Sequence, residues 1–306
     1  MKNALKLFTA TSQFFFLSAR RMKCFFIFFV LSFHSLVPSH AERILVLAPV
    51  CSKSHRISFM PIIEELATKG HQVTVVTPHE SYFKNENITE MRVKNAFQDF
   101  DIDWFSMHKQ SSMEALAQIV KNFRIIMKNG YEILMADNNF QEIIKSRAVD
   151  LVFVDAVLND FTLPIIDYLN VPFIMYSPTS NAPWVFAAVN VPASYASVPG
   201  GSGDNGSKMT FLERVGNLVT SELFFLIRKY YIHNFLDEIA NKDFPNSRPI
   251  SEIERDSSLC IINSHPATAW HRPLPPNVIE IGALHARPAM PLPKVQSYVF
   301  VHDLCF

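Results

Sequence analysis

The sequence predicts an α/β fold in which a Rossmann-like parallel sheet carries helices on both faces. The first observation is the order strand, helix, strand across residues 42–77, which is typical of a βαβ unit on a parallel sheet. The second is that further short apolar runs alternate with segments whose apolar residues recur every three or four positions. The third is size, because 306 residues, 49% of them hydrophobic, are ample for a sizeable core.

The first βαβ unit begins with the apolar run Ile44–Ala48, and a proline-led loop containing Ser54 and His55 follows it. A helix is expected next, since the apolar side chains after this loop recur at helical spacing, and it is expected to end at Gly70. The second strand is expected at Gln72–Thr77. Open α/β sheets bind their ligands at the loops that follow the strands, so the loop with His55 is the first candidate for a site.

Five further strands and four further helices are expected along the chain. Most of these strands are short apolar runs, and the first of the helices has apolar residues at intervals of three and four. The strands are expected at Met91–Phe97, Asp150–Asp155, Val171–Ser177, Ser258–Asn263 and Val278–Ile281. The helices are expected from a capping box at Ser111 and Glu114 to about Asn129, and at Tyr131–Arg147, Phe161–Leu169 and Lys208–Asp237. Pro164 is expected in the first turn of its helix, where proline is tolerated.

Residues 178–207 are expected to form a long irregular loop. Proline and glycine are frequent there, and the aromatic residues Trp184, Phe186 and Tyr195 lie between them. Long irregular loops are often functional. The alternative is a surface excursion whose aromatic side chains pack against the domain, and the sequence leaves both interpretations open.

The N-terminus has the order of a secretory signal peptide, expected to span residues 1–41. Basic residues precede the apolar run Cys24–Phe33, and small residues favour cleavage after Ala41. Because Met22 begins a more ordinary signal, residues 1–21 are interpreted as an upstream extension. The apolar run is too short for a permanent membrane span, and an uncleaved anchor is the alternative.

Two further features bear on the cellular compartment. Asn87 and Asn205 each lie in an Asn-X-Ser/Thr sequon, which predicts glycosylation of a lumenal protein. The cysteines that remain after the signal, at positions 51, 260 and 305, have the spacing of neither a disulfide framework nor a metal site. We therefore expect a lumenal protein without disulfide bonds and without a bound metal.

The composition and the missing motifs disfavour several function classes. Lysine plus arginine equal aspartate plus glutamate, 28 each, which removes the electrostatic argument for nucleic-acid binding. The turn Pro49–Ser54 contains no glycine, so the pyrophosphate of a dinucleotide could not approach it closely. The sequence contains no P-loop, HExxH, CxxC or GxSxG motif. An NAD-type oxidoreductase, a zinc enzyme and an α/β-hydrolase are therefore disfavoured, and no cofactor is expected.

His55 and Asp155 form the remaining candidate for chemistry. Each follows or ends a predicted strand, so both are expected at the carboxyl edge of the same sheet. A neutral histidine can accept a proton from an attacking hydroxyl, and a carboxylate bonded to its other ring nitrogen would fix the tautomer and stabilise the imidazolium. Alternatively, His55 caps the following helix or packs in the loop, and Asp155 caps the helix after its strand.

The sequence from Arg43 to about Tyr298 resembles the N-terminal half of an animal UDP-glycosyltransferase, of the signal-bearing UDP-glucuronosyl and UDP-glucosyl transferase type. The resemblance is collinear. It is carried by RILVLAPVCSKSH, PIIEELATKGHQVTVVTP, VDLVFVDAVLND, VPFIMYSPTS, MTFLERVGNLV and LPPNVIEIGALHARPAMPLPK.

The resemblance implies a GT-B architecture of two facing Rossmann-like domains. Residues 42–287 would be the acceptor-binding domain, and a C-terminal domain would bind the UDP-sugar. His55 would be the general base and Asp155 its partner in an inverting transfer to a small lipophilic acceptor, without a metal. Ser54, Trp184 and Phe186 are candidate acceptor-binding residues, and the family implies the lumen of the endoplasmic reticulum.

The sequence also departs from the family. The donor-binding signature and the C-terminal membrane anchor are missing, and residues 288–306 are interpreted as an interdomain linker with a truncated tail. The chain is therefore expected to transfer little sugar without a donor domain. Two alternatives stay open: a non-catalytic lumenal protein that binds lipophilic ligands or associates with full-length relatives, and an unstable fragment with an exposed interdomain face.

Overall fold

The computed structural model describes residues 41–81, 84–97, 112–180, 182–200, 208–267 and 269–286. Nearly all of the expected signal peptide, the capping box at Ser111, the sequon at Asn205 and the expected linker and tail over 288–306 lie outside these residues. No helix within the described ranges is both long and apolar enough to cross a membrane.

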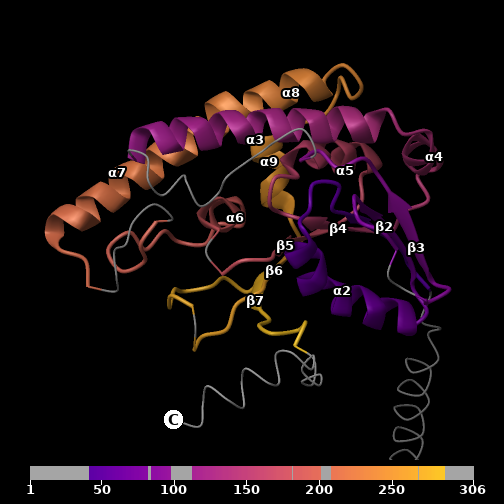
Figure 1. The fold of residues 1–306 in the computed structure, drawn as a ribbon, viewed down its shortest axis with the longest axis horizontal. Helices are drawn as coiled ribbons and strands as arrows, with labels where there is room; N and C mark the ends of the chain where they lie inside the picture. Colours follow the sequence, from indigo (N-terminus) through magenta and orange to yellow (C-terminus); the bar gives the residue numbers. More distant parts are fainter. Residues whose placement is uncertain are drawn as a thin grey trace, which may run out of the picture. The chain divides into compact units, whose positions relative to one another are not determined.

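Seven parallel strands form one sheet in the order β3-β2-β1-β4-β5-β6-β7 (Figure 1). They are β1 Arg43–Leu47, β2 Gln72–Thr77, β3 Ile88–Arg92, β4 Leu151–Asp155, β5 Phe173–Ser177, β6 Leu259–Ile262 and β7 Val278–Glu280. The chain builds outward from β1 to β3 and then crosses back to place β4 on the other side of β1. This reversal makes the border between β1 and β4 a topological switch point, where open α/β sheets bind ligands.

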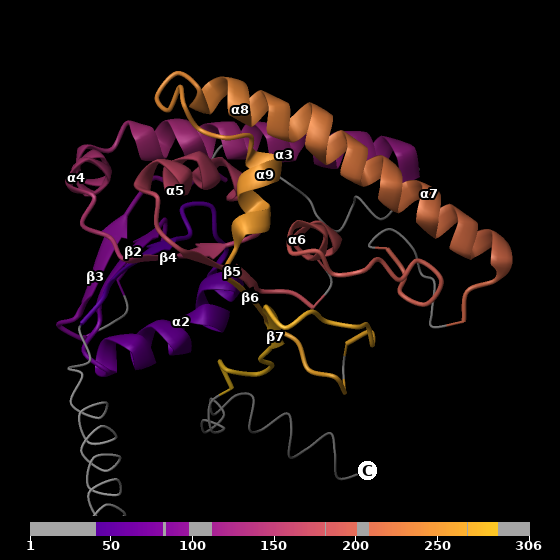
Figure 2. The same cartoon turned by 180° about the vertical axis from the view of Figure 1, so that it is seen from behind.

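Helices cover both faces of the sheet, which confirms the predicted fold class (Figure 2). Helix α2, Lys53–Thr68, packs on one face through Phe59, Ile63 and Ala67. The other face is covered by α3 Ser112–Met135, α4 Asn138–Ser146, α5 Leu163–Leu169, α8 Asn234–Ala240 and α9 Ile250–Ile253. Because both sides of the central strands are buried, those strands consist of nearly continuous apolar residues, which is why the sequence revealed them.

Strand β3 differs from the prediction, which placed it at Met91–Phe97. The observed strand begins earlier, at Ile88, and pairs only with β2 among the described strands. As an edge strand it is half exposed, so its residues need not form an apolar run. Its Glu90 carboxylate instead accepts a hydrogen bond from the Arg56 guanidinium of α2.

The prediction of a helix boundary near Asn129 is also wrong, because α3 continues through Gly130 to Met135. The next helix, α4, begins where the Asp137 carboxylate accepts hydrogen bonds from the backbone N–H groups of Asn139 and Phe140. Gly130 is buried, and a Cβ atom there would lie 2.7 Å from both the Phe161 ring and a Val50 methyl group. The glycine therefore permits close packing rather than ending the helix.

We expect Gly130→Ala to lower the free energy of unfolding by about 1–3 kcal/mol, because the added methyl group overpacks the contact with Phe161 and Val50. Gly216→Ala is the matched control, since Gly216 also lies within a helix but has no atom within 4 Å of the new Cβ. That control should stabilise the protein by about 0.5–1 kcal/mol. Urea unfolding measures the free energy of unfolding of both variants. An equal increase in the two variants would contradict the packing role of Gly130.

The second half contains the predicted strands together with elements that the sequence did not reveal. Pro164 lies in the first turn of α5, as predicted, after the 3₁₀ turn η2, Asp160–Thr162. The range expected to be irregular contains a short helix, α6, Pro183–Ala188, which is a correction to that prediction. The short helix α9 and the 3₁₀ turn η4, Glu254–Asp256, were not predicted.

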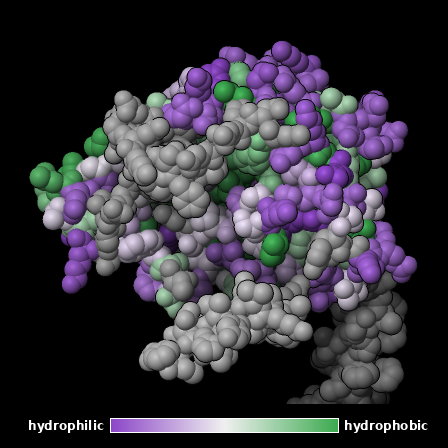
Figure 3. Space-filling model, viewed as in Figure 1, coloured by the Kyte–Doolittle hydropathy of each residue, from purple (hydrophilic) through white to green (hydrophobic). Residues whose placement is uncertain are grey.

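The helix expected over Lys208–Asp237 consists of three joined segments. Helix α7, Phe211–Ile227, begins at a capping box formed by Thr210 and Glu213. The π-helical turn η3, Arg228–His233, joins it to α8. Phe211 and Leu212 are largely exposed, and hydrophobic surface is visible at the outer end of α7 (Figure 3).

Candidate functional site

The candidate site lies at the switch point between β1 and β4. Asp155 is the last residue of β4, and His55 lies in the first turn of α2, which follows β1 after a short loop. The ladder between the two strands ends at the pair Leu47 and Val154. Both side chains are therefore at the carboxyl ends of neighbouring parallel strands.

The structure brings His55 and Asp155 into direct contact. The Nδ1 atom of His55 lies 3.0 Å from Oδ2 of Asp155. The Asp155 side chain is fully buried, whereas 26% of the His55 side chain is exposed. With Nδ1–H donating to the carboxylate, Nε2 is the nitrogen that can accept a proton. The pair has the geometry of a general base and its orienting carboxylate, and that role stays a prediction.

The buried Asp155 carboxylate depends on His55 for the hydrogen bond to its Oδ2 atom. Burial raises the pKa of the Asp155 carboxyl, and the hydrogen bond from His55 and the backbone N–H of Val157 act in the opposite direction. The Val157 N–H lies 3.1 Å from Oδ1, so each carboxylate oxygen has one partner. A buried carboxylate of this kind favours the imidazolium that forms when His55 accepts a proton.

Two other buried groups, Cys51 and Tyr176, border this carboxylate. Burial raises the pKa of the Cys51 thiol well above its usual value, and it raises the pKa of Tyr176 to about 12. Both groups are therefore neutral at physiological pH. Neither group can serve as a nucleophile in its present environment.

The start of α2 shows which residue caps the helix. The Ser52 hydroxyl accepts a hydrogen bond from the backbone N–H of His55 at 3.3 Å, and it lies 2.9 Å from the Ser54 hydroxyl. Ser52 is thus the cap, so the alternative in which the His55 side chain caps the helix does not describe this structure. Ser54 is exposed beside His55, and its acceptor-binding role stays a prediction.

One buried residue of the site was not predicted from the sequence. The Asn159 side chain accepts a hydrogen bond from the Val50 N–H at 3.0 Å and donates to the Val50 carbonyl at 2.9 Å. It also donates to the carbonyls of Asp155 and Val157, at 3.0 and 2.9 Å. Asn159 and Val50 are 109 residues apart, so no local pattern could have revealed this contact.

Trp184 and Phe186 both lie on α6 and pack against the domain. Phe186 is buried, and the guanidinium carbon of Arg272 lies 4.1 Å from its ring centroid. Trp184 is half-buried, with its ring centroid 5.9 Å from that of Phe224 on α7. Phe186 borders a cavity of about 220 Å³ whose walls also include Tyr195 and Arg272. His55 and Asp155 do not line this cavity.

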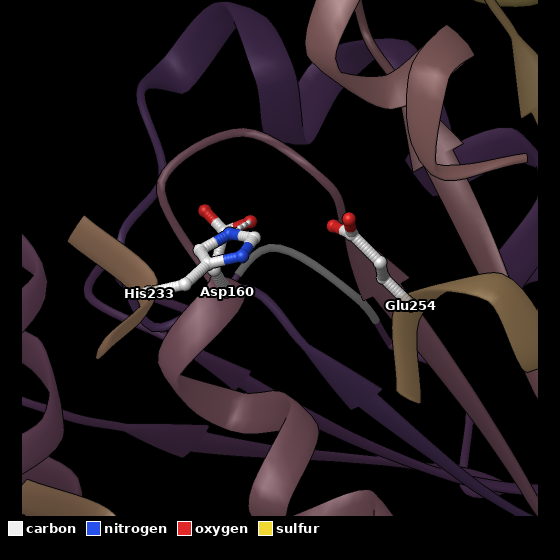
Figure 4. Close-up of side chains that lie close together, drawn as sticks. All are labelled: Asp160, His233 and Glu254. Carbon is white, nitrogen blue, oxygen red and sulfur yellow. Dashed lines mark ion pairs between the residues drawn. The ribbon is translucent and has the colours of Figure 1, made fainter. Parts of the chain in front are cut away.

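A second cluster of ionisable side chains is buried under the helices: Asp160, His233 and Glu254 offer ligand-type atoms within 4.8 Å of one another (Figure 4). The Arg228 guanidinium bridges the two carboxylates, with Nη2 bonded to Asp160 and 2.7 Å from Glu254. Burial acts to raise the pKa of Asp160, but Arg228 and His233 hold it well below its usual range. Because the guanidinium already uses these lone pairs, the cluster is an ion pair network rather than a metal-type donor set.

Asn87 is the only predicted glycosylation site among the described residues. It is half-buried just before β3. Its Nδ2 atom, to which a glycan would be attached, donates to the Ala67 carbonyl at 3.0 Å, and its Oδ1 accepts from Gln72. A glycan would have to replace the bond to Ala67, and glycosylation stays a prediction.

Comparisons with known proteins identify relatives along most of the chain. A sequence model described as UDP-glucoronosyl and UDP-glucosyl transferase matches residues 42–302. UDP-glucosyltransferase 2 from Dactylopius coccus is 28% identical over 268 residues, covering 85% of this chain and 51% of the relative. UDP-glucuronosyltransferase 2A3 from Cavia porcellus is 25% identical over 276 residues, covering 81% of this chain and 50% of the relative.

The crystal structure of CalG4, the calicheamicin glycosyltransferase, aligns with 79% of this chain and 53% of its own, at 15% identity and a TM-score of 0.48. The chain spans about half the length of the curated relatives it matches.

Proposed function

Because this chain belongs to the UDP-glucuronosyl and UDP-glucosyl transferase family, we propose that it is the acceptor-binding half of an inverting sugar transferase. The observation that carries the proposal is the contact between His55 and the buried Asp155 at the switch point of the sheet. A base is needed there because an acceptor hydroxyl is a weak nucleophile until its proton is removed.

The proposed reaction follows from the two nitrogens of His55. The acceptor oxygen attacks the anomeric carbon of the sugar while Nε2 of His55 accepts the hydroxyl proton. The bond between that carbon and the UDP oxygen breaks, UDP leaves with the electron pair, and the configuration inverts. Asp155, bonded to Nδ1, holds the ring in the required tautomer and stabilises the imidazolium.

The substrates are assigned by the same proposal. The acceptor is a small lipophilic molecule, supported by the apolar side chains around α6. Phe186 borders the cavity there. Trp184, the other candidate wall, packs against the core and does not line that cavity. The UDP-sugar is a co-substrate of a second, donor-binding domain, because the turn after β1 lacks the glycines that a tightly bound diphosphate requires. No metal or cofactor takes part in the proposed step.

The compartment is also a proposal. The signal-like order of residues 1–41 and the sequons at Asn87 and Asn205 support entry into the secretory pathway and a position in the lumen of the endoplasmic reticulum. Treatment of the expressed protein with an endoglycosidase tests this. A mobility shift that disappears in Asn87→Gln or Asn205→Gln supports it, and no shift contradicts it.

A second candidate function is non-catalytic binding of lipophilic ligands, alone or in association with full-length relatives. It is favoured by the cavity beside α6, which His55 and Asp155 do not line. Calorimetry with the 306-residue chain separates the two: tight binding of a UDP-sugar would contradict this candidate and the assignment of the donor to another domain.

The catalytic proposal is tested by fusing the donor domain of a family member after Lys294 and measuring sugar transfer to a panel of lipophilic phenols. His55→Ala in this fusion is expected to lower the rate about 10²–10⁴-fold, because the general base is lost. Urea unfolding of the same variant checks that the fold is intact. Transfer that survives the substitution unchanged would overturn the role of His55.

A further inference from the structure

Asp155 is the last residue of β4 and pairs with Tyr176 of β5, so its backbone belongs to the sheet, whereas the position of His55 relative to it depends on the loop after β1. The last paired residues of β1 and β4 are Leu47 and Val154, and His55 lies eight residues beyond the end of that ladder. Side chains must therefore hold the loop after β1 against the end of β4 and the loop that follows it. A small error in this arrangement would separate Nδ1 of His55 from the carboxylate.

Asn159 makes the connection between these loops. It is 1% exposed, and its amide group contacts Val50 in both directions, accepting from the N–H at 3.0 Å and donating to the carbonyl at 2.9 Å. The remaining donor capacity is shared between the carbonyls of Asp155 and Val157, at 3.0 and 2.9 Å. One side chain thus bonds backbone groups of the loop after β1, of the end of β4 and of the loop after β4.

The contacts of Asn159 lead directly to both members of the pair. Val50 lies two residues before Ser52, whose hydroxyl accepts the backbone N–H of His55 and fixes the start of α2. At the end of β4, Asn159 donates to the backbone carbonyl of Asp155 itself, and the N–H of Val157 donates to the Asp155 carboxylate.

On these observations, and building on the proposed function, we propose that Asn159 is a positioning residue that sets the His55–Asp155 distance and thereby the tautomer of the His55 ring. It touches no reacting atom; it acts through the backbone of both loops.

The matched control is Asn217, a second buried asparagine with the same kind of bonds. Its Nδ2 donates to the carbonyls of Tyr195 and Val198 at 2.8 and 2.9 Å, and its Oδ1 accepts from the Gly200 N–H at 2.6 Å. It joins α7 to the segment before it and has no hydrogen bond to either loop of the pair. Asn217→Ala therefore removes a comparable set of bonds without touching Val50 or Asp155.

The first readout needs no donor domain. Two-bond ¹H–¹⁵N spectra of the histidine-labelled 306-residue chain report the tautomer of each ring, and His55→Gln assigns the His55 signals among the 11 histidines. We expect the Nδ1–H tautomer of His55 in the wild type and in Asn217→Ala. In Asn159→Ala we expect a mixture with the Nε2–H form, because Asp155 no longer lies within hydrogen-bond distance of Nδ1. An unchanged tautomer in Asn159→Ala would overturn the proposal.

Asn159→Ser covers the case in which the alanine variant does not fold. Its hydroxyl can still bond within the loop after β4 but is too short to reach Val50, so the same tautomer mixture is expected. A serine variant that folds and keeps the wild-type tautomer would equally overturn the proposal.

The second readout is transfer by the fusion protein with a donor domain. We expect Asn159→Ala to lower kcat about 10–100-fold with little change in the KM for the acceptor, as for a small displacement of a catalytic group. A kcat of Asn159→Ala equal to that of the wild-type fusion would overturn the positioning role while leaving the proposed function intact. A shifted tautomer in a fusion that transfers no sugar would instead support the positioning role and refute the proposed function.

Discussion

Asp155→Asn is expected to lower the rate of sugar transfer about 10⁴-fold in the fusion with a donor domain, an effect of the size seen when the orienting carboxylate of a histidine base becomes an amide. An asparagine at this position has the same shape, but its NH₂ group can donate to Nδ1 and so favours the wrong tautomer. The imidazolium that forms during transfer would also lose its counter-charge.

Asp155→Asn is expected to affect the stability of the protein differently from its rate of sugar transfer. Burial raises the pKa of Asp155, so the folded state disfavours its charged form. This contribution lowers the free energy of unfolding at pH values above the ordinary carboxyl pKa of about 4. It disappears below that pH, where the carboxyl is protonated in both states. An asparagine carries no such charge. We therefore expect the urea midpoint at neutral pH to stay the same or to rise.

Asp150→Asn is the matched control for Asp155, because Asp150 directly precedes the same strand. Its carboxylate forms an exposed ion pair with Arg43 at 2.6 Å, and solvent screens such surface pairs. Transfer should be unchanged in this variant. If Asp155→Asn retained transfer within a factor of ten of Asp150→Asn, the assigned role of Asp155 would be wrong.

Arg228→Met is expected to lower the free energy of unfolding by about 3–5 kcal/mol, because it leaves the carboxylates of Asp160 and Glu254 buried without their shared cation. Arg248→Met is the matched control. Arg248 also bridges two carboxylates, Asp167 at 2.7 Å and Asp256 at 2.6 Å, but 49% of its side chain is exposed. Its loss should cost only about 0–1 kcal/mol.

The pH dependence distinguishes a buried charge effect from simple loss of packing. Arg228 and His233 hold the pKa of Asp160 below its usual range despite burial, so its stabilising contribution is present above about pH 4 and is lost as the pH falls through the folded-state pKa. The difference in the free energy of unfolding between the wild type and Arg228→Met should therefore become smaller as the pH is lowered below about 4. A difference that stays constant from pH 7 to pH 3 would contradict the electrostatic explanation.

How much of the fold the sequence predicts depends on where each element lies. Strands β1, β4 and β5 are largely buried on both faces, so their apolar runs are nearly continuous and their positions follow from the sequence. The edge strand β3 is half exposed, and Gly130 lies where helix and loop pack closely, so local signals were misleading at both.

The candidate site likewise contains residues that the sequence predicts and residues that it does not. His55 and Asp155 could be placed at one sheet edge because each directly follows or ends a strand. Asn159 could not be identified as a residue of the site from the sequence, since its role depends on its contact with Val50, 109 residues away. The ion pairs of Arg228 with Asp160 and Glu254 likewise join residues 68 and 26 positions apart. Local sequence patterns indicate which residues are buried and whether a segment is a helix or a strand. Contacts between residues far apart in the sequence depend on the completed fold.

The π-helical turn η3 has a consequence for aligning this region with relatives. In a regular α-helix, side chains five residues apart point about 140° away from each other. In η3 the Asn234 N–H donates to the Lys229 carbonyl, five residues back, and Arg228 and His233 both reach Asp160. The helical phase of α8 is therefore offset from that of α7 by one residue. A gap-free alignment to a relative with a regular helix here would match the wrong core positions in every residue after His233.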